Sequence, residues 1–134
     1  MSPVIEAAIK NGVYVIIDWH AHTMHTKEAT MFFTNMAKKY GKYPNVIYEL
    51  YNEPIQDKWD SLKVYGKTII TAIRKYDPDN IILMGCPHWD QDIDIAAASP
   101  IEGVSNVFCC DEDLQNFLNV TKTHFTNTLD INND

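Results

Sequence analysis

The sequence predicts an α/β fold built on a parallel sheet, and three observations support this class. Short apolar, β-branched segments alternate with segments whose apolar residues recur at helical spacing. Polar and aromatic residues follow each apolar segment, as they do at the carboxyl ends of parallel strands. The chain has 134 residues, of which 46% are hydrophobic and 22% charged, so it has the size and composition of one ordinary globular domain.

The first repeat of this pattern lies near the N-terminus. Residues 3–10 resemble a helix that ends an earlier β-α unit. Residues 13–17 form an unbroken run of Val, Tyr and Ile, which predicts a strand buried on both faces. A helical stripe follows, and Gly41 ends it; its members are Ala29, Phe32, Phe33, Met36, Ala37 and Tyr40.

The same pattern continues along the chain. Residues 45–51 predict a second strand, and apolar residues at helical spacing between 59 and 73 predict a second helix. Residues 81–85 predict a third strand, 93–98 a short helix and 106–110 the beginning of a fourth strand. Residues 1–108 therefore form the predicted domain, with parallel strands joined through helices. Residues 109–134 are a divergent tail with little periodicity, expected to be poorly ordered.

Composition excludes several functional classes. The formal charge of −7, from 11 basic and 18 acidic residues, argues against nucleic acid and against anionic membranes. No apolar run is long enough to span a bilayer, and the N-terminal residues lack the features of a secretory signal peptide. No glycine-rich phosphate loop follows a strand. The three cysteines predict small buried side chains rather than a disulfide framework or a zinc site.

Asn52-Glu53-Pro54 is the strongest candidate for catalysis. Glu53 follows a buried strand, so its carboxyl is expected at the mouth of an apolar sheet, partly desolvated as a general acid requires. Asn52 can donate and accept hydrogen bonds, which suits a sugar hydroxyl, and Pro54 turns the chain. The alternative is that Glu53 caps the following turn.

Other polar and aromatic residues follow the strands. His20 can bind substrate, orient Glu53 or form a structural pair with Asp18, and Trp89 is either a platform for a sugar ring or a buried aromatic. Glu49 has the side-chain parity of Glu53 and is expected to have an ion-pair or hydrogen-bond partner. The carboxylates near residue 92 are expected to begin the short helix: Asp90, Asp92 and Asp94. The histidines at 20, 22 and 25 lack the spacing of a complete metal site, so no metal is predicted.

Together these segments resemble glycoside hydrolase family 5 cellulases. Residues 13–22 resemble the third strand of the family's barrel and 45–54 the fourth, while 76–82 and 89–92 are similar to the approach to and exit from the fifth. The similarity runs from about Val4 to Val107. It implies a retaining endo-β-1,4-glucanase on a (β/α)₈ barrel, which needs roughly 250 residues. This chain would be about half of that barrel, from the third strand to the start of the sixth.

The resemblance also implies roles for individual residues. Glu53 matches the acid/base, Asn52 the residue that positions the sugar 2-hydroxyl and the nucleophile, and His20 and Trp89 match substrate-binding residues. The family's nucleophile lies on a seventh strand that this chain lacks, so the chain alone is expected to be inactive. No cofactor is implied, the expected partner is a β-glucan, and the full-length enzyme is expected outside the cell. The alternative function is that of a non-catalytic glucan-binding or partner-binding remnant of the same fold. Separately, the open sheet edges of half a barrel predict self-association of the chain.

Overall fold

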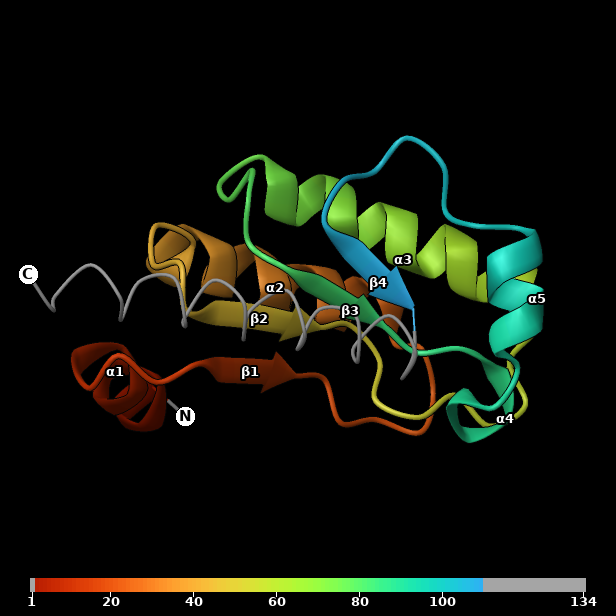
Figure 1. Ribbon diagram of the computed structural model, residues 1–134, viewed down its shortest axis with the longest axis horizontal. Coiled ribbons are helices and arrows are strands. Elements are labelled where there is room, and N and C mark those ends of the chain that lie inside the picture. The colour runs from red at the N-terminus through yellow and green to blue at the C-terminus, as the bar shows by residue number, and fades with distance from the viewer. Residues whose placement is uncertain (1, 110–134) are drawn as a thin grey trace, which may run out of the picture.

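The computed structural model describes residues 2–109 and has one sheet of four parallel strands (Figure 1). The strands are β1 (Val15–Asp18), β2 (Val46–Glu49), β3 (Ile82–Met84) and β4 (Val107–Cys109), and they lie in the order β1-β2-β3-β4. The helices are α1 (Ser2–Lys10), α2 (Thr26–Tyr40), α3 (Trp59–Arg74), α4 (Pro87–Asp90) and α5 (Ile93–Ala98). The predicted α/β class and its parallel sheet are therefore confirmed.

Element boundaries follow the sequence signals closely. α2 carries Lys38 and Lys39 in its last turn, where cations interact favourably with the helix dipole, and it ends before Gly41. A Cβ atom at residue 41 would lie 2.6 Å from the Ala37 oxygen and 2.7 Å from Cβ of Asp77. Glycine is therefore required there, because the chain approaches Asp77 closely.

One face of the sheet is covered by α2 and α3. The strand register places Ile17, Tyr48 and Ile82 side by side on this face, and each is at most 3% exposed. The ring of Phe33 from α2 lies edge-on to Tyr48 with 6.2 Å between centroids. The Tyr48 hydroxyl donates a 2.6 Å hydrogen bond to Oδ2 of the buried Asp77. This face holds the apolar core.

The opposite face of the sheet is not covered in the same way. The register places Ile16 and Asp18 of β1, Ile47 and Glu49 of β2 and Leu83 of β3 on this face. Ile16, on the edge strand, is 49% exposed, whereas Ile47 is 6% exposed. The expectation that residues 13–17 are buried on both faces is therefore wrong. A continuous apolar run shows that a strand is suited to burial, but β1 lies at the edge of the sheet described by residues 2–109, and Ile16 on this face stays exposed. We call this the open face below.

The structure also bears on the predictions for the cysteines and for the C-terminal tail. Cys86 is fully buried, as expected, but it is disulfide-bonded, which the cysteine count did not predict. Cys109 is partly buried, and Cys110 lies outside the described residues. The predicted tail, 109–134, also lies almost wholly outside them, so its order and the boundary at residue 108 stay predictions. No helix within residues 2–109 is long and apolar enough to cross a membrane.

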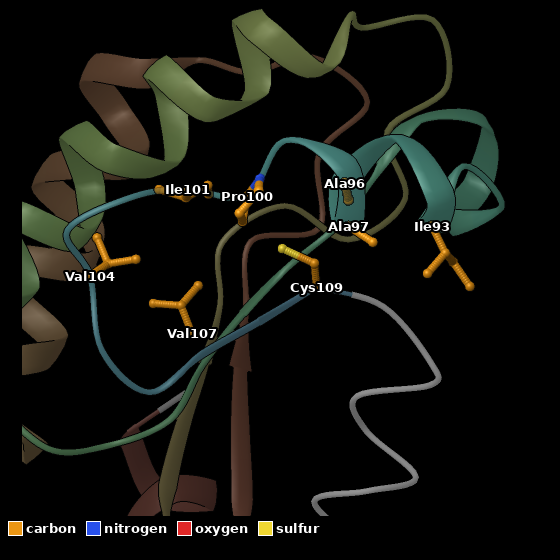
Figure 2. Close-up of a pocket in the computed structure, with 8 residues that line it drawn as sticks. All are labelled: Ile93, Ala96, Ala97, Pro100, Ile101, Val104, Val107 and Cys109. Atoms are coloured by element: carbon orange, nitrogen blue, oxygen red, sulfur yellow. The ribbon is translucent and has the colours of Figure 1, made fainter.

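An apolar pocket of about 240 Å³ lies between α5 and β4 (Figure 2). Its walls include Ile93 and Ala96 of α5, Ile101 of the following loop, and Val107 and Cys109 of β4. None of the residues predicted for catalysis or substrate binding lines this pocket. The candidate site must be sought instead at the carboxyl ends of the strands.

Candidate active site

The carboxyl ends of β1, β2 and β3 point toward the same end of the molecule, where α4 lies (Figure 1). Asp18 ends β1 and Glu49 ends β2, and the two are register partners across the strand pair. The loops that follow these strands carry His20, Asn52 and Glu53. The parallel sheet therefore gathers the predicted site residues at one edge, as expected for this class of fold.

The Asn52-Glu53-Pro54 segment lies in the loop after β2 and is held against the end of β3. A Cβ atom at Gly85 would lie 2.6 Å from Cδ of Pro54 and 2.9 Å from the Asn52 oxygen. The backbone N–H of Trp89 donates a 2.9 Å hydrogen bond to the Pro54 oxygen. The segment that carries the predicted acid/base is therefore fixed in two ways. It packs closely against Gly85, which has no side chain, and it accepts the backbone hydrogen bond from Trp89.

Glu53 itself is exposed, Asn52 is half-buried and Pro54 is buried. The expectation of a partly desolvated Glu53 is wrong for this chain, because β2 ends at Glu49 and the loop carries Glu53 beyond the strand. Within residues 2–109 no hydrogen bond joins the Glu53 side chain to a backbone N–H, so the turn-capping alternative gains no support. The side chain is accessible for proton transfer to and from a bound ligand.

His20 forms a pair with Asp18 while its ring stays open to solvent. Nδ1 of His20 lies 3.0 Å from Oδ2 of Asp18, and the His20 side chain is 66% exposed. The structural pair and the ligand-facing role are thus compatible, because the pair uses one ring nitrogen and leaves the other available. In the described part of the chain, no group of three or more His, Cys, Asp or Glu side chains is arranged to hold a metal ion.

Trp89 lies in α4, the segment after β3, whose backbone is a strained turn rather than a regular helix, and Trp89 is 52% exposed. The alternative of a buried aromatic is therefore wrong. His88, Trp89 and Asp90 have φ values of 53°, 56° and 62°, in the left-handed region. This conformation costs about 1–2 kcal/mol for each residue with a side chain.

Local hydrogen bonds hold the strained turn in place. The backbone N–H of Cys86 donates to Oδ1 of Asp90 at 2.7 Å, and Nδ1 of His88 lies 2.6 Å from Oδ2 of Asp92. Asp90 was expected to begin the short helix, but it stabilises this turn instead, while Asp92 and Asp94 lie at the start of α5. The turn could not be predicted from the sequence, because His, Trp and Asp in succession do not signal positive φ.

Glu49 is the group in this site whose ionisation is most perturbed. Burial raises its pKa to about 7, and the charges of Asp18, Asp90 and Glu53 act in the same direction, while His20 opposes them. The expected partner of Glu49 is therefore not a cation, since three of the four charged groups acting on it are carboxylates. Of these groups, Asp18 is the register partner of Glu49 on the neighbouring strand.

Comparisons with known proteins agree with this arrangement. The family model "Cellulase (glycosyl hydrolase family 5)" matches residues 1–111. Endoglucanase Z of Dickeya dadantii is 50% identical over 101 residues, which cover 73% of this chain and 24% of that protein. An endoglucanase of Clostridium saccharobutylicum is 43% identical over 114 residues, covering 80% of this chain and 25% of the relative. The chain thus spans about a quarter of the length of these curated relatives.

Solved structures show the same relationship. The catalytic domain of Thermobifida fusca endoglucanase Cel5A, in complex with cellotetraose, has a TM-score of 0.76 at 33% identity. The match covers 81% of this chain and 39% of that domain. The four parallel strands and their helices are therefore a part of a (β/α)₈ barrel. The chain belongs to the cellulases of glycosyl hydrolase family 5 and forms about half of their barrel.

Proposed function

We propose that the complete enzyme hydrolyses β-1,4-glucosidic bonds in cellulose or a related β-glucan by a retaining mechanism, and that this chain carries the acid/base half. The observation that carries the proposal is the Asn52-Glu53-Pro54 segment, fixed at the carboxyl end of β2 in a family 5 fold. The endoglucanase relatives support glucan hydrolysis as the reaction of the family.

In this mechanism Glu53 acts twice. Its protonated carboxyl first donates a proton to the leaving glycosidic oxygen, and its carboxylate then takes a proton from the attacking water. Asn52, half-buried beside it, holds the sugar 2-hydroxyl and orients the nucleophile. The nucleophile is a carboxylate roughly 5 Å from Glu53 in a retaining enzyme. It is contributed by a part of the barrel outside this chain, so the chain alone is inactive.

Two exposed rings contribute to substrate binding. The indole of Trp89 stacks on the apolar face of a sugar ring, and the free nitrogen of His20 binds a sugar hydroxyl. The solved complex of the related Cel5A domain with cellotetraose supports a β-glucan as the ligand class. Because such a polymer lies outside cells, the complete enzyme acts extracellularly.

A hybrid barrel tests the proposal. Residues 1–109 replace the matching segment of Endoglucanase Z, to which this chain is 50% identical. The hybrid is expected to hydrolyse carboxymethylcellulose, and Glu53→Gln to lower kcat by about 10²–10⁴-fold. With aryl cellobiosides that carry an activated leaving group, Glu53→Gln should lower the glycosylation rate less, because that leaving group needs no protonation. Glu102→Gln, an exposed carboxylate after α5, is the matched control and should leave kcat unchanged. A Glu53→Gln hybrid with full activity would refute the acid/base role.

The alternative function is glucan binding without catalysis, and the exposure of Trp89 and His20 in the chain favours it. Isothermal titration of the 134-residue chain with cellotetraose tests it, with Trp89→Ala as the variant that should weaken binding. Absence of heat in a folded sample would eliminate this function. Hydrolysis of carboxymethylcellulose by the chain alone, lost in Glu53→Gln, would show that the chain needs no further strand.

A further inference from the structure

Two carboxylates lie side by side at the carboxyl end of the sheet. Asp18 of β1 and Glu49 of β2 are register partners, and their side chains point to the open face. Neighbouring strands are about 4.8 Å apart, so aligned side chains on one face meet. Two ionised carboxylates in this arrangement repel each other. The pair is therefore expected to hold a single negative charge.

The hydrogen bonds of Asp18 show which member keeps that charge. Oδ2 of Asp18 lies 3.0 Å from Nδ1 of His20, a nitrogen that donates when it carries a proton. Oδ1 of Asp18 is buried and has no hydrogen-bond donor. An acceptor that is buried without a donor is costly, and a neighbouring protonated carboxyl would supply one. Asp18 is thus arranged as the acceptor of the pair.

The surroundings of Glu49 favour its protonated form. The charged groups that act on it come from four places: Asp18 of β1, His20 after β1, Glu53 after β2 and Asp90 of α4. Three of them are carboxylates, and together with burial they raise the pKa of Glu49 to about 7. Glu49 is therefore the member of the pair that holds the proton.

We propose that Glu49 is a positioning residue whose protonated carboxyl donates a hydrogen bond to the buried Oδ1 of Asp18, which holds the Asp18–His20 pair in place beside Glu53. Asp18 then accepts from Glu49 at Oδ1 and from Nδ1–H of His20 at Oδ2, and Nε2 of His20 stays free to accept from a sugar hydroxyl. The importance of this arrangement for catalysis rests on the proposed function, but the hydrogen bond itself does not.

Nuclear magnetic resonance of the 134-residue chain, labelled in its carboxyl and imidazole groups, tests the hydrogen bond without substrate. The Glu49 carboxyl is expected to titrate near pH 7 rather than at its ordinary value of 4.5. His20 is expected in the Nδ1–H form in the wild type and in Glu49→Gln, whose amide can still donate. Glu49→Leu has no donor, so the Nδ1 signal of His20 should shift. Glu102→Gln is the matched control, and it should leave His20 unchanged.

Two results would overturn the proposal: titration of Glu49 near 4.5, or identical His20 signals in the wild type and Glu49→Leu. If Glu49→Leu does not fold, the titration and the Glu49→Gln spectrum decide. In the hybrid barrel, Glu49→Leu should lower kcat about tenfold with little change in KM, and Glu49→Gln should restore it. Failure of the hybrid to hydrolyse glucan refutes the proposed function, whereas the resonance measurements are independent of that outcome.

Discussion

The two faces of the sheet differ in what supports them. On the face covered by α2 and α3, Ile17, Tyr48 and Met84 are at most 3% exposed, and they pack against helices of this chain. On the open face, Ile16 is 49% exposed, and the carboxylate of Glu49 lies at the carboxyl end. Apolar burial against α2 and α3 therefore stabilises one face, while the candidate chemistry is concentrated at the end of the other.

This difference implies that stability and chemistry can be separated by mutation. In a complete (β/α)₈ barrel the second face turns inward and is filled by side chains from the other strands. Substitutions on the helix-covered face should therefore unfold the chain, whereas substitutions on the open face should alter association, ionisation or ligand binding. Four predictions test this division, from the largest expected effect to the smallest.

Phe33→Ala should give the largest loss of stability. Phe33 is 0% exposed and packs against Tyr48, so truncation leaves a cavity that costs about 3–5 kcal/mol. Ile16→Ala, on the open face, is the matched control and should cost less than about 1 kcal/mol. Urea unfolding followed by circular dichroism measures both. Equal losses of unfolding free energy in the two variants would mean that both faces contribute equally to stability, which would contradict the prediction.

Gly85→Ala should disturb the carboxyl end of the sheet, where the candidate site lies. The new Cβ would lie 2.6 Å from Cδ of Pro54 and from the Tyr51 oxygen, so the loop that carries Glu53 must move. Overpacking of this kind costs about 1–3 kcal/mol. Denaturation gives the cost, and amide shifts of residues 51–54 report the movement. Unchanged shifts would show that the close contact does not position the loop.

Ile16→Lys should weaken self-association of the chain. The open face and the unpaired strand edges invite pairing with a second copy, and a charge on the exposed Ile16 opposes it. The association constant is expected to fall by about tenfold, or about 1.4 kcal/mol. Sedimentation velocity over a range of concentrations measures it. A wild-type chain that stays monomeric at all concentrations would contradict the prediction.

The smallest expected effect is a change in the pH dependence of stability. The pKa of Glu49 is raised in the folded chain, so its protonated form is favoured by folding. That contribution is complete below pH 4.5 and is lost as pH rises through about 7. Since Glu49 is half-buried, we expect about 1 kcal/mol after allowance for solvent screening. Glu49→Gln should flatten the unfolding free energy over this range; an unchanged slope would contradict it.

The local signals in the sequence were sufficient for most of the fold. Helical spacing and β-branched runs located the long helices, and the short helix at 93–98 has the predicted bounds. The exposure of Ile16 could not be predicted, because the burial of a strand face depends on whether distant segments cover it. The exposure of Glu53 was missed for a different reason: β2 ends at Glu49, earlier than the predicted end of the strand at residue 51.

The candidate site was predicted in part. Polar residues after strands located His20, Glu53 and Trp89 at one edge of the sheet. The pairing of Asp18 with Glu49 depends on strand register, which the spacing of residues within each strand does not give. The strained turn at Trp89 depends on hydrogen bonds to Pro54 and Asp90, and no local residue preference announces it.

The order of the strands in the sheet has a consequence for how the chain folds. Because β1, β2, β3 and β4 are neighbours in the same order in which they occur in the sequence, each strand pairs with the one made just before it. Among the strands of residues 2–109, none has to be inserted between two that have already paired. During synthesis from the N-terminus, the sheet can therefore grow one β-α unit at a time, and each new pairing closes only the crossover that joins two successive strands.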